Sequence, residues 1–85
     1  MNRYDRLLTL LKAKFPSAHI ALTDDSADHA GHGHGEAGET HYRLRISDTS
    51  FSELTSIKIH REILTAIKPE TDAGMHSFVI EKATA

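Results

Sequence analysis

A chain of 85 residues is long enough for one small domain, and because it has no cysteine it can form no disulfide. Its 10 Lys and Arg against 12 Asp and Glu give a formal charge of −2, which argues against nucleic-acid binding driven by bulk charge. No apolar run is long enough for a transmembrane helix, and the first residues do not resemble a signal peptide. We therefore expect a single domain over residues 1–85 in a reducing compartment, the cytoplasm.

The first predicted element is an amphipathic helix over residues 2–14. Four leucines recur at helical spacing between charged residues, and Asn2 is a favourable N-cap. Pro16 should end this helix, because the residue before a proline avoids the helical conformation. Apolar residues then alternate with polar ones over residues 18–24, a pattern that predicts a short strand.

A loop rich in histidine and glycine is predicted next, at about residues 25–38. Three histidines and three glycines fall within eight residues, a composition without helical or strand periodicity. Neutral imidazole is a common ligand of zinc, copper, nickel and iron, so these histidines are candidate metal ligands. The alternative from composition alone is a solvated, low-complexity loop. The histidines concerned are His29, His32 and His34.

A second strand is predicted over residues 39–47, where polar and apolar residues alternate. The apolar residues should face the core, while His41, Arg43 and Arg45 should face solvent. Because the two strands are consecutive, they should pair antiparallel, which makes the histidine-rich loop a long hairpin connection. Long loops of this kind are often functional.

A second helix is predicted over residues 56–68 and should end at Pro69. One face of this helix should pack in the core. Its residues are Ile57, His60, Leu64 and Ile67, and Ile59 and Ile63 beside them make the apolar face wider. We therefore expect His60 to be a core histidine hydrogen-bonded to the backbone.

A loop over residues 71–74 and a third strand over residues 75–82 complete the chain. His76, Phe78 and Ile80 share one face of this strand. The preceding helix is long enough for a right-handed crossover to a parallel strand. The sequence therefore predicts an α+β domain, with a three-stranded mixed sheet and helices on one of its faces.

Several short motifs follow one another in an order that resembles the BolA family. They are Asp-Asp-Ser-Ala-Asp-His-Ala-Gly-His at residues 24–32, Glu-Thr-His-Tyr at 39–42, the helix start at 55–61 and Gly-Met-His-Ser-Phe at 74–78. The resemblance implies a class II KH-like fold, α-β-β-α-α-β, with a short extra helical turn near residues 51–55. One departure is Ile59, which replaces the first arginine of the family's Arg-His-Arg motif and counts against functions that need that basic helix face.

The resemblance also implies a function. BolA proteins pair with monothiol glutaredoxins, share a 2Fe-2S cluster with them, and act in iron–sulfur cluster trafficking or iron homeostasis. On this chain the ligands would be His76 and His29. His32 is the alternative to His29, and His34 has no counterpart in the family. Histidines can replace two cysteines on one iron, as in Rieske centres. The isolated chain has no thiolate, so we expect the partner side, including glutathione, to complete the cluster.

Two other readings stay open, and both are binding functions rather than enzymatic ones. A KH-like fold is compatible with a nucleic-acid-binding transcriptional regulator, although no Gly-x-x-Gly clamp lies between the helices. Its candidate surface consists of Arg43, Arg45, Lys58 and Arg61. The other reading is divalent metal binding by the histidine-rich loop alone. We expect no membrane association, and a monomer or weak homodimer in the absence of a partner.

Overall fold

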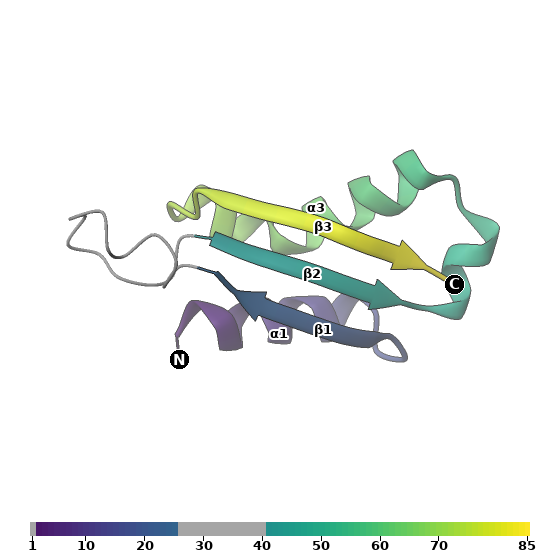
Figure 1. Ribbon diagram of the computed structural model, residues 1–85, viewed down its shortest axis with the longest axis horizontal. Helices are drawn as coiled ribbons and strands as arrows, with labels where there is room; N and C mark the ends of the chain where they lie inside the picture. Colours follow the sequence, from purple (N-terminus) through teal and green to yellow (C-terminus); the bar gives the residue numbers. More distant parts are fainter. Residues whose placement is uncertain (1, 26–40) are drawn as a thin grey trace.

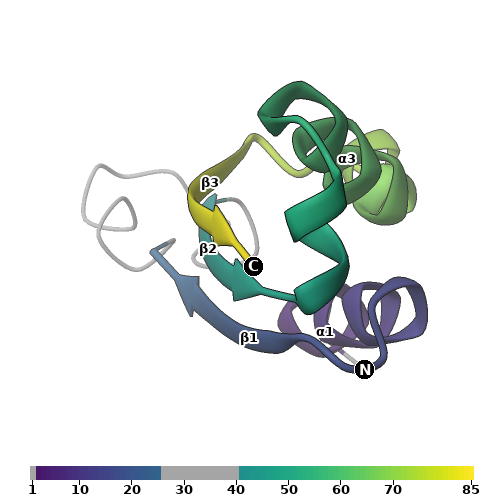
Figure 2. The same ribbon diagram turned by 90° about the vertical axis from the view of Figure 1, so that its right-hand side faces the viewer.

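The computed structural model describes residues 2–25 and 41–85. The helices are α1 (Arg3–Lys14), the 3-10 helix η1 (Thr49–Glu53) and α3 (Ser56–Asp72), and the strands are β1 (His19–Asp24), β2 (His41–Ser47) and β3 (Ser77–Thr84). The strands form one sheet in the order β1-β2-β3, with β1 antiparallel and β3 parallel to β2. Both α-helices lie on one face of the sheet, and the other face is open (Figure 1, Figure 2). The predicted α+β class, mixed sheet and short extra helical turn are confirmed.

Helix α1 begins and ends as its sequence predicts. The side chain of Asn2 accepts a hydrogen bond of 2.9 Å from the backbone N–H of Asp5, which satisfies one of the free donors at the helix start. Two lysines in the last turn suit the negative end of the helix dipole.

In the described ranges, 2–25 and 41–85, no helix has the length and apolar character needed to cross a membrane.

The hydrophobic core lies between the two α-helices and the inner face of the sheet. An edge-to-face contact between Phe15 and Phe51, with ring centroids 5.4 Å apart, joins the end of α1 to η1. Alternating residues of β2 point into the core, as the period of two predicts. The buried apolar residues are Leu7, Leu11, Phe15, Leu22, Tyr42, Leu44, Ile46, Phe51, Ile59, Ile63, Ile67 and Met75.

The predicted buried face of α3 is correct only in part: Ile67 is buried, as are Ile59 and Ile63, but the other three predicted residues are exposed. Ile57 and Leu64 are 67% and 48% exposed, and His60 is exposed rather than part of the core. The residues that are buried are Ile59, Ile63, Ile67 and Glu70. Successive residues are about 100° apart around the helix axis, and the apolar residues of α3 therefore lie on two overlapping stripes. The stripe that contains Ile63 is the buried one, because it faces α1 and the sheet.

The prediction that Pro69 ends the second helix is also wrong, because α3 continues to Asp72. A proline inside a helix removes one backbone donor and crowds the carbonyl four residues earlier. The turn that follows Pro69 is nevertheless held in place, because Glu70 is buried and bound to two arginines of α1. Tertiary contacts thus outweigh the local preference for a helix end at this position.

The true end of α3 is a glycine cap. The N–H of Met75 donates to the carbonyl of Glu70 at 3.1 Å, and the N–H of Gly74 donates to the carbonyl of Thr71 at 3.2 Å. This pair of bonds defines a Schellman motif, in which the residue after the cap takes a positive φ. Gly74 has a φ of 106°, which side chains with a Cβ rarely adopt.

Replacing Gly74 by alanine should therefore destabilise the protein by about 1–2 kcal/mol through backbone strain. A Cβ at this position would meet no atom within 4 Å, so steric overlap does not contribute. Urea denaturation measures the loss. The Gly74→Asn variant should lose less, because asparagine tolerates positive φ better, and equal losses in the two variants would contradict the explanation.

Strand β3 contains one extra residue relative to β2. Leu44 pairs with Ile80 and Arg45 with Lys82, which leaves Glu81 between the two pairs. This bulge shifts the alternation, so that Ala83 packs against the core in line with Ile80. The strand begins at Ser77 instead of residue 75, because the cap of α3 occupies the predicted start. It ends at Thr84 instead of residue 82.

Candidate functional site

His76 lies between the cap of α3 and the start of β3. Its neighbour Met75 is only 8% exposed and belongs to the core, whereas His76 itself is exposed. The next residue, Ser77, already pairs with β2 in parallel register. An exposed imidazole is thus held between a buried side chain and a paired strand, which fixes its backbone on both sides.

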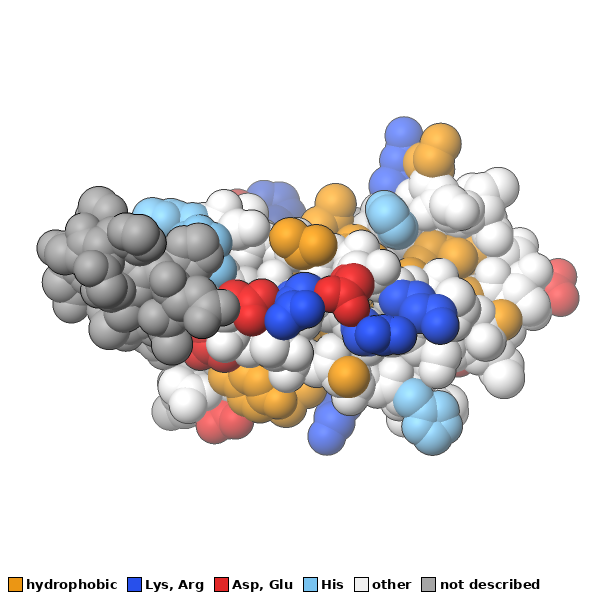
Figure 3. Space-filling view, viewed as in Figure 1, with side chains coloured by type: hydrophobic (Ala, Val, Ile, Leu, Met, Phe, Trp, Pro, Cys, Tyr) orange, Lys and Arg blue, Asp and Glu red, His pale blue; other side chains and the backbone are white. Residues whose placement is uncertain are grey.

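A second imidazole lies beside it. His41 pairs with Ser77, so the parallel register brings it next to His76, and the two ring centroids are 6.1 Å apart with the ring planes at 80°. His41 is half-buried, and Figure 3 shows histidine side chains on the surface at this end of the sheet. Sequence reasoning placed His41 on the polar strand face and missed this pairing. The signal that could have found it is the parallel alignment of the second and third predicted strands.

The chain leaves β1 and enters β2 at this same end of the sheet. The N–H of Asp25 donates a hydrogen bond of 2.9 Å to the carbonyl of His41. The segment between these two residues carries the other predicted ligands. They are His29, His32 and His34, all of which lie outside the described residues.

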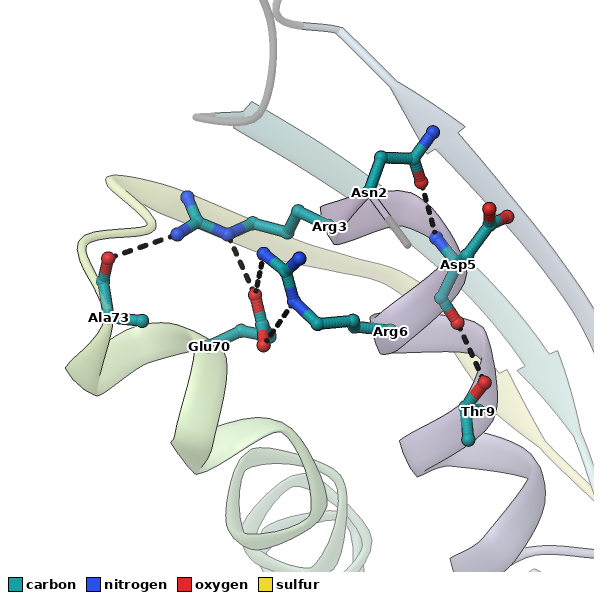
Figure 4. A network of polar contacts seen from close by, with 7 residues as sticks. All are labelled: Asn2, Arg3, Asp5, Arg6, Thr9, Glu70 and Ala73. Carbon is teal, nitrogen blue, oxygen red and sulfur yellow. Dashed lines mark hydrogen bonds and ion pairs between the residues drawn. The ribbon is translucent and has the colours of Figure 1, made fainter.

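An ion-pair network, the Arg3–Glu70–Arg6 clamp, holds the turn that leads to His76 (Figure 4). Arg3 Nε donates to Glu70 Oε1 at 2.9 Å, and Arg6 Nε donates to Glu70 Oε2 at 2.9 Å. Arg3 also donates through Nη2 to the carbonyl of Ala73 at 3.0 Å. The clamp therefore connects the start of α1 to the last turn of α3 and to its C-cap Ala73, three residues before His76.

The clamp keeps Glu70 ionised. The hydrogen bond from Arg6 lowers the pKa of Glu70 below its ordinary value of 4.5, and the bond from Arg3 acts in the same direction, although burial opposes both. The side chains of Glu70 and Arg3 are 7% and 10% exposed, so this is a buried ion pair. Such a pair is costly to break, because the remaining charge stays out of water.

The open face of the sheet carries a row of opposite charges (Figure 3). Arg43 forms ion pairs of 3.0 Å with both Asp25 and Glu81, and Arg45 contacts Glu81 at 3.3 Å. Hydrogen bonds to Asp25 and to Glu81 raise the pKa of Arg43 above its ordinary value, which is already high. The two arginines are therefore matched by carboxylates and offer little uncompensated positive charge to a phosphate backbone.

The other two residues of the predicted basic surface lie elsewhere. Lys58 and Arg61 are exposed on α3, which packs on the inner face of the sheet. Arg43 and Arg45 alternate with the core residues of β2 and so point to the opposite face. The structure does not bring these four side chains together into one surface.

Within residues 2–25 and 41–85, no group of three or more His, Asp or Glu side chains is arranged to hold a metal ion. The imidazole pair His41–His76 supplies two nitrogen donors of the type that can bind iron in a mixed nitrogen and sulfur site. These donors fit part of the coordination of such a centre. The remaining ligands have to come from other residues or from another molecule.

The fold and the site together define a small α+β domain that presents exposed imidazole at one end of a mixed sheet. Comparison with known proteins identifies the family: the model for BolA-like protein matches residues 11–85. The chain belongs to the BolA family, as the order of its motifs indicates.

Solved structures with the same fold support this assignment. The chain is similar to BolA1 from Arabidopsis thaliana, with a TM-score of 0.83 and 26% identity over 99% of this chain and 93% of that one. It is also similar to the BolA domain of SufE1 from Arabidopsis thaliana, with a TM-score of 0.79, 31% identity and the same coverage, 99% and 93%. A further relative is the uncharacterised protein in the cobS 5′ region of Sinorhizobium sp., 36% identical over 76 residues that cover 87% of this chain and 81% of that protein.

Proposed function

We propose that this protein is an accessory protein of iron–sulfur cluster trafficking or iron homeostasis, which shares a 2Fe-2S cluster with a monothiol glutaredoxin. The observation that carries the proposal is the exposed imidazole of His76, held at the start of β3 in a chain of the BolA family. Similarity to the BolA domain of a SufE protein supports a role related to iron–sulfur chemistry. The role is one of binding and requires no catalytic step by this chain.

The chemistry of the donors explains why the cluster has to be shared. Iron–sulfur clusters are held mainly by cysteine thiolates, and this chain has no cysteine. Imidazoles can complete the coordination of one iron, but they do not replace the thiolates of the other. This chain therefore supplies nitrogen ligands, while a glutaredoxin cysteine and glutathione supply sulfur from the partner side.

The position of His76 suits a shared ligand. His76 directly precedes β3, whose start lies at one end of the sheet (Figure 1). Its side chain is exposed, so a partner can approach it without displacing the core. Its backbone is fixed by the pairing of β3 and by the clamp on the last turn of α3. Ligands on rigid elements bind metal centres with less loss of conformational freedom, so the partner surface should include the start of β3 and the end of α3.

A titration tests the proposal. The protein is added to a monothiol glutaredoxin that carries a 2Fe-2S cluster with glutathione, and the cluster is followed by visible absorption and circular dichroism. We expect a new cluster spectrum that saturates at one protein per cluster, since two thiolates are exchanged for imidazoles. An unchanged glutaredoxin spectrum at excess protein would contradict the proposal, as would a full complement of cluster bound by the isolated chain.

A further inference from the structure

We propose that the open face of the sheet carries a binding site for a small phosphate monoester, at the end of the sheet away from His76. The site is a hollow of about 280 Å³ over the end of β2. It uses no residue of the proposed function, so the two proposals stand or fall separately. The open-face residues that line the hollow are His19, Ala21, Arg45, Ser47, Lys82 and Thr84.

The register of the sheet places these six residues in two rows across the three strands. One row consists of His19, Ser47 and Thr84. The other row consists of Ala21, Arg45 and Lys82. Neighbouring strands lie about 4.8 Å apart, so each row is about 10 Å wide. Three short side chains, of alanine, serine and threonine, thus lie among the longer ones of histidine, arginine and lysine, and this difference in length makes the hollow.

The bulge in β3 brings the lysine of this site onto the open face. Ile80 pairs with Leu44, so strict alternation would turn Lys82 towards the helices. The extra residue, Glu81, reverses this, and Lys82 pairs with Arg45 instead. Bulges commonly re-aim a side chain next to a functional site. Here the bulge sets two basic side chains side by side.

The positive charge at this end is not fully matched. Glu81 pairs with both Arg43 and Arg45, and Asp25 pairs with Arg43. Within the part of the chain that the structure describes, no ion pair involves Lys82. Three cations therefore face two carboxylates, and Figure 3 shows basic side chains gathered over this part of the sheet. The Arg45–Glu81 pair is exposed, at 56% and 35%, so an anion can compete for the guanidinium.

The donors suit a phosphate monoester. A guanidinium and an ammonium group give charge-assisted hydrogen bonds to phosphate oxygens. The hydroxyls of Ser47 and Thr84 and the imidazole of His19 add further donors, and no hydrogen bond within the described residues occupies these three side chains.

The size and the surroundings of the hollow favour a small ligand. Its volume lies near the lower limit of about 300 Å³ for ligand sites, which suits a phosphate group with a small substituent. A long polyanion fits less well, because Asp25 and Glu81 continue the open face beyond the hollow.

A titration followed by nuclear magnetic resonance tests the site. Inorganic phosphate and glycerol 3-phosphate are added separately to the nitrogen-15-labelled protein at constant pH and ionic strength. We expect saturable shifts of the amide signals at the start of β1 and at the ends of β2 and β3. Lys82→Ala should weaken binding about tenfold, because it removes a charge-assisted hydrogen bond. Glu81→Gln should tighten binding, because it releases Arg45 and removes a neighbouring negative charge.

Lys58→Ala is the matched control, because it removes the same charge from α3, on the other side of the molecule, and should leave binding unchanged. Shifts that do not saturate, equal losses in Lys82→Ala and Lys58→Ala, or weaker binding by Glu81→Gln would overturn the proposal. A second arm uses a single-stranded oligonucleotide without a terminal phosphate, which offers phosphodiesters only. Tighter binding of this oligonucleotide than of glycerol 3-phosphate would overturn the proposal in favour of a nucleic-acid surface.

Discussion

Replacing Glu70 by alanine is expected to destabilise the protein by about 3 kcal/mol, the cost typical of breaking a buried ion pair. Arg3, whose side chain is 10% exposed, would lose its carboxylate partner while its charge stays out of water. The last turn of α3 would lose its connection to α1. The free energy of unfolding in urea at neutral pH measures the effect.

The exposed ion pair in the same turn provides the control. Lys68 and Asp72 form a 2.8 Å pair in which both side chains are more than half exposed, at 66% and 61%. Exposed pairs contribute little, so Asp72→Ala should change stability by less than about 0.5 kcal/mol. If the two substitutions had equal effects, the clamp would not have the importance that its burial indicates.

The clamp also makes stability depend on pH. Because the folded-state pKa of Glu70 lies below its ordinary value of 4.5, the stability gained from its ionisation is complete above that value. It is lost as the pH falls through the folded-state pKa. The advantage of the unmodified protein over Glu70→Gln should therefore shrink in unfolding curves recorded between neutral pH and about pH 3.

The Ile63→Ala substitution is expected to cost about 2–5 kcal/mol, because it leaves a cavity in the core. Ile63 has no exposed surface, whereas its neighbour Leu64 is 48% exposed. Leu64→Ala removes a similar volume from the surface and should cost less than about 1 kcal/mol. Urea denaturation of the two variants distinguishes the buried face of α3 from the face that periodicity alone favoured. A larger loss for Leu64→Ala would contradict the packing described.

These α3 residues show why part of the fold could not be predicted from the sequence. In β2 the strict alternation of apolar and charged residues leaves one assignment of faces, and the structure agrees with it. In α3 apolar residues occur on two neighbouring stripes, so periodicity allows either Ile63 or Leu64 to face the core. The choice depends on contacts with α1 and the sheet, which are distant in sequence.

The end of α3 was missed for a related reason. Pro69 is a strong local signal for a helix end, but Glu70 directly after it meets two arginines that lie more than sixty residues earlier in the chain. A local rule does not contain this contact. Gly74 is a better signal for the end of α3 than Pro69, because it has the positive φ that a helix cap requires.

The site was predicted in part. The family resemblance directed attention to His76, and the structure shows it exposed at the start of β3. The neighbour His41 was not anticipated, because alternation alone assigned it to a polar strand face. Its position beside His76 depends on the parallel register of β2 and β3, two strands that a whole helix separates in the chain.

The proposed function makes His76 the main ligand that this protein offers to a shared cluster. The most direct test is the glutaredoxin titration with His76→Ala, run beside His19→Ala, since both replace an exposed histidine. We predict that His19→Ala produces the same new circular dichroism spectrum as the unmodified protein, and that His76→Ala leaves the glutaredoxin spectrum unchanged. A His76→Ala variant that still produced the full new spectrum would contradict the role of His76 as the main ligand.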